Sequence, residues 1–398
     1  MNEKMRKLGA ERSVIRELFE YGKKRKLEIG NENVFDFSIG NPSVPTPQEV
    51  TDELERLLRE TEPTALHGYT SAQGDRVARQ AVASYLNRTF SAGADPDLIY
   101  LTAGAAASLT VTLNAILDPG DEVVLLAPFF PEYRVFAEKA GGKTVIVPPD
   151  SATFLPDFDA LEKAVGERTR ALILNSPNNP SGAILPEEGL KRLCAILDRQ
   201  QKKNGSPIYL ISDEPYRELV WDGTAVPFVT GYYDNAVVCY SFSKSLSLPG
   251  ERIGYILVNP RAEAANALYE AVCGAGRALG FVCAPALFQH LLPVCMGRTA
   301  DFTAYRTNRE LLWKGLTALG FQAVLPQGAF YLFVRAPEPD ARAFSERAKQ
   351  NELLLVPSDS FGMPGYVRLS YCVPTEQIRR AMPAFAALAQ SYGLKQND

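Results

Sequence analysis

The sequence predicts an α/β fold, with a mostly parallel sheet of seven strands between helices and a smaller α+β domain beside it. The middle of the chain alternates short apolar runs with helical stretches. Strands that are apolar throughout are typical of a parallel sheet covered on both faces. The last third gathers helices with only a few strands, as an α+β domain does. A chain of 398 residues also exceeds the size that one ordinary core supports, which favours two domains.

The elements can be placed in order along the chain. The seven expected strands lie at residues 99–101, 122–126, 143–147, 171–175, 208–212, 236–240 and 255–258. Helices are expected between them at residues 105–117, 133–140, 158–165 and 187–203. The tail favours a helix at 301–319, a strand at 328–334, a helix near 341–350, a strand at 366–370 and a closing helix from 375. The N-terminal segment favours one helix and a strand at 35–38, and it could join the tail. We therefore expect a large domain at residues 45–291 and a small discontinuous domain from residues 1–44 and 292–398.

Composition narrows the class of protein. Apolar residues make up 46% and charged residues 22%, with a net charge of −4, so we expect a soluble protein that does not bind nucleic acid. No apolar run approaches the roughly 20 residues of a membrane span. Residues 1–26 are highly charged and lack the apolar core of a secretory signal. We therefore expect a cytoplasmic protein without a membrane partner.

Cysteine and histidine usage argues against several chemistries. The six cysteines lack CxxC spacing, which favours buried small side chains over disulfides or metal ligands. Only two histidines occur, His67 and His290, whereas zinc sites and histidine-based triads need properly placed imidazoles. We expect no metal, and chemistry carried by other side chains or by a cofactor.

Small and polar residues follow two of the expected strands, at the end where parallel sheets bind ligands. After residues 99–101, the backbone of Gly104, Ala105 and Ala106 could hold a phosphate at a helix N-terminus, although tight strand–helix packing explains the same residues. Residues 175–182 form a turn by composition, in which an Asn amide could also donate to a ligand oxygen.

Ionisable side chains follow two further strands. Asp213 is either a helix N-cap or a carboxylate that needs a cationic partner, such as a protonated pyridine nitrogen. A lysine at a strand end, such as Lys244, is usually a solvated surface group, but partial desolvation near other cations makes it a nucleophilic amine. Arg252, eight residues further on, could supply that second cation and bind phosphate.

These motifs occur together and in a fixed order. Asn-Pro-Ser-Gly at 179–182, Asp-Glu-Pro-Tyr at 213–216 and Ser-Phe-Ser-Lys at 241–244, followed by Arg252, resemble the class I and II aminotransferases. These are pyridoxal-phosphate (PLP) enzymes of fold type I, similar to aspartate aminotransferase. The resemblance covers nearly the whole chain, from residue 40 to residue 368. It implies a large PLP-binding domain, a smaller domain and a homodimer.

The resemblance assigns the contacts to the cofactor. Lys244 would hold PLP as a Schiff base and then move the Cα proton, while Asp213 would keep the pyridine nitrogen protonated. Asn179 and Tyr216 would hydrogen-bond the phenolic oxygen of the ring. The phosphate would be bound by Gly104, Ala105, Ala106, Ser241, Ser243 and Arg252.

The resemblance also assigns a stacking ring, the substrate contacts and the partner. Phe130, or Phe129 in its place, would stack on the cofactor. The substrate would be contacted by Gly40, Asn179 and Arg368. The arginine among them would clamp the α-carboxylate of the amino acid with two hydrogen bonds. Tyr69 would reach the active site of the partner subunit, so that dimerisation would complete each site.

The expected reaction is transfer of an amino group from an α-amino acid to a 2-oxo acid. A PLP-dependent carbon–sulfur β-lyase stays open, because reaction choice depends on how the substrate lies against the ring. A PLP-sensing regulator domain is disfavoured, since no helix-turn-helix is expected before Gly40. Ala105 and Ala106 depart from the many relatives with a hydroxyl residue in this loop, so phosphate binding there would use backbone alone. The amino donor stays open.

Overall fold

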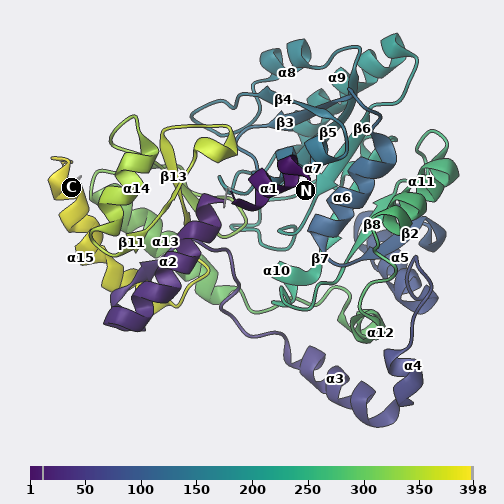
Figure 1. Cartoon of the computed structure of the whole chain (residues 1–398), viewed down its shortest axis with the longest axis horizontal. Coiled ribbons are helices and arrows are strands. Elements are labelled where there is room, and N and C mark those ends of the chain that lie inside the picture. Colours follow the sequence, from purple (N-terminus) through teal and green to yellow (C-terminus); the bar gives the residue numbers. More distant parts are fainter. Residues whose placement is uncertain (11–12, 396–398) are drawn as a thin grey trace.

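Helices cover both faces of a central seven-stranded sheet in the computed structural model, which describes residues 1–10 and 13–395 (Figure 1). The strand order is β2-β8-β7-β6-β5-β3-β4. The strands are β2 (Ile99–Thr102), β3 (Glu122–Leu126), β4 (Lys143–Val147), β5 (Thr169–Asn175), β6 (Tyr209–Asp213), β7 (Ala236–Ser241) and β8 (Gly254–Val258). β8 is antiparallel to both neighbours and the other pairs are parallel. The predicted mostly parallel sheet is confirmed.

The two helical layers follow from the alternation of side chains along each strand. Val124 and Leu172 pack into one apolar core, whereas Val123 and Leu125 pack into the core on the opposite face. The first core is closed by α5 (Arg76–Phe90), α8 (Phe158–Ala164), α9 (Glu187–Asn204) and α12 (Ala286–Cys295). The second is closed by α6 (Ala105–Ile116), α7 (Glu132–Lys139) and α11 (Ala265–Ala278). Burial on both faces is why these strands are apolar throughout.

A smaller α+β region is built around a four-stranded antiparallel sheet. In spatial order its strands are β12 (Val356–Pro357), β13 (Tyr366–Ser370), β10 (Tyr331–Arg335) and β9 (Gln322–Ala323). Its helices are α2 (Val14–Ile29), α13 (Thr303–Ala318), α14 (Ala341–Lys349) and α15 (Thr375–Ser391). β1 (Phe35–Asp36) pairs with β11 (Leu353–Leu354), so the N-terminal segment lies against the C-terminal third. The division at residues 44 and 291 remains our proposal, and residue 291 falls within α12.

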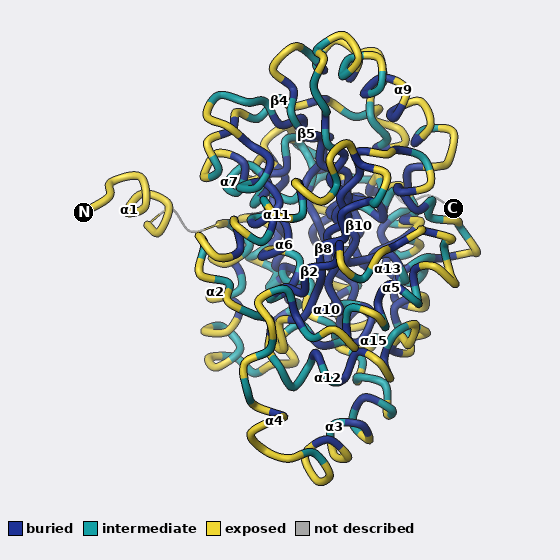
Figure 2. Tube along the Cα trace, turned by 90° about the vertical axis from the view of Figure 1, so that its right-hand side faces the viewer, coloured by how far each residue is buried: buried dark blue, intermediate teal, exposed yellow. Residues whose placement is uncertain are grey.

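The N-terminal segment forms two helices where the sequence favoured one. α1 (Glu3–Ala10) precedes α2, and the Ser13 side chain accepts a hydrogen bond from the backbone N–H of Arg16 to begin the second helix. Figure 2 shows α1 standing away from the rest of the molecule, with every residue exposed. The sequence also left five longer helices unassigned: α3 (Gln48–Glu60), α4 (Pro63–His67), α5, α11 and α12. Within the described part of the chain, no helix is long and apolar enough to span a membrane.

Candidate active site

The predicted site residues meet at one cavity of about 270 Å³ between the large sheet and the smaller α+β region. Twelve of them line it: Gly40, Ala105, Ala106, Phe130, Asn179, Asp213, Tyr216, Ser241, Ser243, Lys244, Arg252 and Arg368. Gly104 lies beside the cavity, against the Arg252 guanidinium. Tyr69 is 92% exposed and does not line the cavity. The carboxyl ends of β2, β5, β6 and β7 thus converge, as the parallel arrangement predicts.

Lys244 lies on a single helical turn that directly follows β7. This turn, α10 (Phe242–Ser245), begins where the Ser241 hydroxyl accepts a hydrogen bond from the backbone N–H of Ser243, at 3.1 Å. The hydroxyl of Tyr240, the penultimate residue of β7, donates to the Ser245 hydroxyl at 2.9 Å. Both contacts fix the turn to the end of the strand, so the position of Lys244 is set by the sheet.

The Lys244 amine is prepared to react as a neutral nucleophile. Its Nζ donates to the carbonyl oxygen of Gly40 at 2.6 Å. Burial lowers the pKa of Lys244 to about 8, and the positive charges of Arg252 and Arg368 act in the same direction. About a tenth of the amine is therefore uncharged at pH 7, far more than for an ordinary lysine, and the uncharged form is the one that reacts with a carbonyl group.

Asp213, the last residue of β6, is a buried carboxylate with one free oxygen. Oδ2 accepts a hydrogen bond from the Tyr133 hydroxyl, but Oδ1 has no hydrogen-bond partner among the described residues. Burial raises the pKa of Asp213 to about 7, against the opposing effect of the Tyr133 hydrogen bond. No helix begins at Asp213, so the alternative prediction of a helix N-cap is wrong. A buried oxygen without a partner indicates a place for a donor on a ligand.

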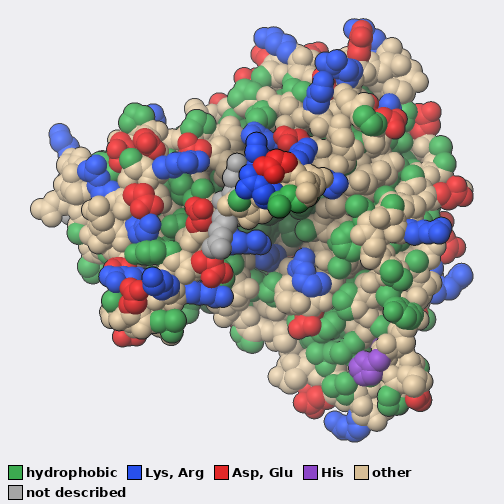
Figure 3. All heavy atoms as spheres, viewed as in Figure 1, with side chains coloured by type: hydrophobic (Ala, Val, Ile, Leu, Met, Phe, Trp, Pro, Cys, Tyr) green, Lys and Arg blue, Asp and Glu red, His purple; other side chains and the backbone are tan. Residues whose placement is uncertain are grey.

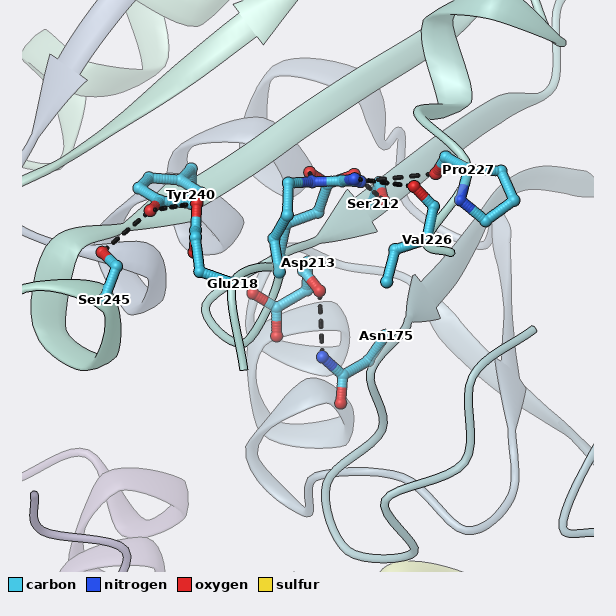
Figure 4. A network of polar contacts seen from close by, with 10 residues as sticks. Asn175, Ser212, Asp213, Glu218, Val226, Pro227, Tyr240 and Ser245 are labelled. Carbon is cyan, nitrogen blue, oxygen red and sulfur yellow. Dashed lines mark hydrogen bonds and ion pairs between the residues drawn. The ribbon is translucent and has the colours of Figure 1, made fainter. Parts of the chain in front are cut away.

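A buried ion pair supports the loop that follows Asp213 (Figure 4). Glu214 and Arg217 are in direct contact, and both side chains are almost fully buried. The Ser212 hydroxyl donates to Oε1 of Glu214 at 2.7 Å. Arg217 also donates to the carbonyl oxygens of Val226 at 3.2 Å and Pro227 at 3.4 Å. The pair ties the carboxyl end of β6 to the loop at residues 226–227 and leaves Asp213 free to face the cavity.

Donors for an anion gather where α6 begins. Gly104 has φ +86°, which favours glycine, and a Cβ there would lie 2.7 Å from Nη2 of Arg252, so a larger residue would displace that guanidinium. Arg252 Nη1 donates to the carbonyl oxygen of Pro249 at 2.9 Å. The hydroxyl oxygens of Ser241 and Ser243 are 2.6 Å apart on the same wall. A helix N-terminus, an arginine and two hydroxyls together can hold a phosphate.

Arg368 connects three distant segments at the opposite side of the cavity. It lies on β13 and is 2% exposed. Nη1 donates to Oδ1 of Asn179 at 3.1 Å, and Nη2 donates to the carbonyl oxygen of Ser38 at 2.5 Å. Nε has no hydrogen-bond partner among the described residues. The charge of this buried guanidinium is not neutralised by any described carboxylate, which fits a role in binding an anionic group of a substrate.

Two tyrosines belong to the site although no role was predicted for them. Tyr133 holds Asp213, as described above. The Tyr331 hydroxyl lies 2.9 Å from that of Tyr216, and its ring lies 4.6 Å from the Arg368 guanidinium carbon. A Cβ at Gly40 would lie 2.0 Å from the Tyr331 hydroxyl, so the backbone of residue 40 needs glycine for this close approach. Tyr216 and Tyr331 are 115 residues apart in the sequence, so no local motif predicts the contact between their hydroxyls.

The two candidate stacking rings have different surroundings. Phe130 is partly buried, lines the cavity and packs edge-on against Tyr133 with ring centroids 5.7 Å apart. Phe129 is buried away from the cavity, where its ring would be 2.5 Å from a Cβ at Gly362. The geometry therefore favours Phe130 for the predicted stacking role.

Comparison with known proteins identifies the family. Residues 32–385 match the family described as aminotransferase class I and II. The chain belongs to the class I and II aminotransferases. This aminotransferase is 32% identical to the aspartate/prephenate aminotransferase of Thermus thermophilus, over 91% of this chain and 93% of that one. It is 29% identical to a probable N-acetyl-LL-diaminopimelate aminotransferase of Bacillus subtilis, over 89% of each chain.

Solved aminotransferase structures have the same fold. A crystal structure described as an amino transferase from Eubacterium rectale matches with a TM-score of 0.96 and 54% identity, over 98% of this chain and 99% of that one. The aspartate aminotransferase from Thermus thermophilus with maleate matches with a TM-score of 0.84 and 28% identity, over 96% and 98%. Fold type I and an aminotransferase activity are thereby confirmed. The names of these relatives support amino transfer over the lyase and regulator alternatives.

Proposed function

We propose that this aminotransferase uses pyridoxal 5'-phosphate and that Lys244 moves the proton at Cα while an amino group passes from an α-amino acid to a 2-oxo acid. One observation carries the proposal. A buried amine and a buried carboxylate with opposite pKa shifts line the same cavity, Lys244 lowered to about 8 and Asp213 raised to about 7, in both cases by burial. Titratable groups perturbed in this way cluster at catalytic sites.

The described residues fit each polar group of this cofactor. Oδ1 of Asp213, which has no partner, can accept a hydrogen bond from a protonated pyridine nitrogen. Arg252 and the N-terminus of α6 can hold the phosphate, and Lys244 can attach the aldehyde carbon. The bound cofactor supplies an electron-withdrawing ring that makes the Cα proton of an amino acid acidic.

The remaining groups of the cavity would orient the substrate. Arg368 would bind the α-carboxylate through its free Nε and so place Cα near Nζ of Lys244. Asn179 would help to hold the Arg368 guanidinium in place, since its Oδ1 already accepts a hydrogen bond from Nη1 of Arg368. Tyr216 would present its hydroxyl to the phenolic oxygen of the cofactor. Positioning of this kind reduces the motion that remains before proton transfer.

A homodimer is part of the proposal. Tyr69 is 92% exposed and does not line the cavity of its own chain, so its side chain is available to a second subunit. Figure 3 shows apolar side chains gathered at the lower right of the molecule, where Figure 1 places α3, α4 and α12. Leu58 of α3 is also exposed. We propose that a second subunit covers this face and receives Tyr69 at its active site, and sedimentation analysis gives the oligomeric state. A cytoplasmic location remains a prediction.

Replacement of Lys244 tests the mechanism. The Lys244→Ala variant, purified with the cofactor, should lack the visible absorption band of covalently attached cofactor and should show no measurable turnover. The matched control is Lys139→Ala, because Lys139 is exposed and lies at the far end of α7. It should retain both properties. Covalent attachment and normal turnover in Lys244→Ala would overturn the proposal.

A further inference from the structure

We propose that the amino donor of this enzyme carries an uncharged, mainly apolar side chain rather than a second carboxylate. The inference rests on the proposed function of the cavity and adds the class of substrate to it. It follows from three features of the wall: which charges are present, which polar groups are already paired, and which surface is left for a side chain.

The cations of the cavity are all engaged in other roles. Among the described lining residues they are Lys244, Arg252 and Arg368. Lys244 is the attachment point for the cofactor, Arg252 lies against Gly104 at the anion site, and Arg368 faces the α-carboxylate. A second carboxylate would therefore find no positive charge in the described wall. A carboxylate that leaves water without a cationic partner keeps most of its desolvation penalty.

Several uncharged polar groups of the cavity wall already form internal hydrogen bonds. Oδ1 of Asn175 accepts from the backbone N–H of Asn179 at 2.7 Å, and its Nδ2 donates to the backbone oxygen of Asp213 at 2.9 Å. The Tyr216 and Tyr331 hydroxyls hydrogen-bond each other. The Ser241 and Ser243 hydroxyls do so as well. Each hydroxyl pair keeps one free O–H, and the phenolic oxygen and the phosphate of the cofactor would take these two donors, so neither is left for a carboxylate on the substrate side chain.

The remaining wall is apolar and lies next to the point where the substrate would react. Ile39 precedes Gly40, whose carbonyl oxygen accepts from Nζ of Lys244. Ile15, from the first turn of α2, lines the same cavity. Leu109 also lines the cavity, and these side chains give an apolar surface that an aliphatic or aromatic side chain can cover. Names of relatives do not decide the question, because they include both aspartate and aromatic-amino-acid aminotransferases.

Single-turnover half-reactions test the inference. The cofactor-loaded enzyme is mixed with aspartate, glutamate, leucine, methionine or phenylalanine without an oxo acid, and the change of the visible band is followed. At least one apolar amino acid should react with a specificity constant more than about tenfold above that of aspartate and glutamate. Faster reaction with aspartate or glutamate would overturn the inference and leave the proposed function intact. An unchanged band with every amino acid would overturn both.

A positive charge introduced into the apolar wall of the cavity tests the inference through ligand affinity, without any measurement of turnover. Calorimetric titration with maleate and with 4-methylpentanoate compares a dicarboxylate with an apolar monocarboxylate. The unaltered enzyme should bind 4-methylpentanoate more tightly, and Ile15→Lys should reverse the order, because it adds a cation to the apolar surface. Ile15→Met, which adds similar length without charge, should keep the original order. Tighter maleate binding by the unaltered enzyme would contradict the inference.

Discussion

Burial has opposite effects on the two central ionisable side chains. It disfavours the charged form of each group, so it lowers the pKa of Lys244 to about 8 and raises that of Asp213 to about 7. The amine thus becomes available as a nucleophile, while the carboxylate needs a cationic partner to ionise fully. The same desolvation would therefore suit both residues to the proposed cofactor, which has one electrophilic carbon and one basic nitrogen.

The raised pKa of Asp213 predicts how the stability of the cofactor-free protein depends on pH. The folded state resists ionisation of this carboxyl, so the stability present below its ordinary pKa of 3.8 is lost as pH rises to about 7. Asp213→Asn removes this loss. Its melting temperature should therefore fall less than that of the unaltered protein between about pH 5 and about pH 8. Calorimetry of both cofactor-free proteins measures the difference, and parallel curves would contradict the prediction.

Tyr331 is predicted to position both Tyr216 and Arg368. Tyr331→Phe keeps the ring beside the guanidinium but removes the hydroxyl that lies 2.9 Å from that of Tyr216, a loss of about 1 kcal/mol. The pH midpoint of the cofactor band should shift, with little change in KM for the amino donor. Tyr331→Leu also removes the ring and should raise KM several-fold. Spectroscopic titration measures the midpoint, and steady-state kinetics measure KM. An unshifted midpoint in Tyr331→Phe would rule out a role of Tyr331 in positioning Tyr216.

Residue roles could be predicted from the sequence where they follow a strand end. Asp213, Lys244 and Arg252 lie in short motifs whose order along the chain points to the cavity that they share. The contributions of Tyr133 and Tyr331 could not be predicted, because their partners are 80 and 115 residues away. The contact of Tyr133 depends on how α7 packs on the large sheet, and that of Tyr331 on how the two sheets lie against each other. No local pattern encodes either arrangement.

Helices and strands, like single residues, could be predicted where the local sequence determines them and not where distant contacts do. The strands of the large sheet were predicted to within a few residues, since burial on both faces makes most of them continuous apolar runs. The two-residue strands β9, β11 and β12 are too short to show an alternation, and they exist only through their pairing partners. The break between α1 and α2 was missed because a single capping serine is a weak signal in a charged segment.

The N-terminus of α6 gives a prediction about cofactor affinity. A methyl group at Gly104 would meet Nη2 of Arg252 at 2.7 Å, so Gly104→Ala should weaken cofactor binding by about tenfold, or 1.4 kcal/mol. Gly120→Ala is the matched control, because Gly120 also has a positive φ but a Cβ there meets nothing within 4 Å. Both should lose similar stability from backbone strain, and only the first should lose affinity in an absorbance titration. Equal affinities would contradict the prediction.

At the scale of the whole molecule, the buried pair Glu214–Arg217 should contribute strongly to stability. Arg217→Ala leaves a carboxylate buried without its partner, which should lower the free energy of unfolding by about 3–5 kcal/mol. The control is the exposed pair Arg199–Glu162, where Arg199→Ala should cost less than about 1 kcal/mol. Urea unfolding of the cofactor-free proteins measures both. Similar losses of unfolding free energy at the two sites would show that the buried pair contributes no more to stability than the exposed pair.

Arg368 of β13 contacts both Ser38 and Asn179, and the order in which these three segments are synthesised affects when the protein can acquire activity. The ribosome delivers the chain from its N-terminus at about 5–20 residues per second. Ser38, Asn179, Asp213 and Lys244 therefore emerge well before β13, which carries the arginine. A nascent chain could capture its cofactor while it still lacks the group that grips a substrate. Selectivity would then be the last property to mature.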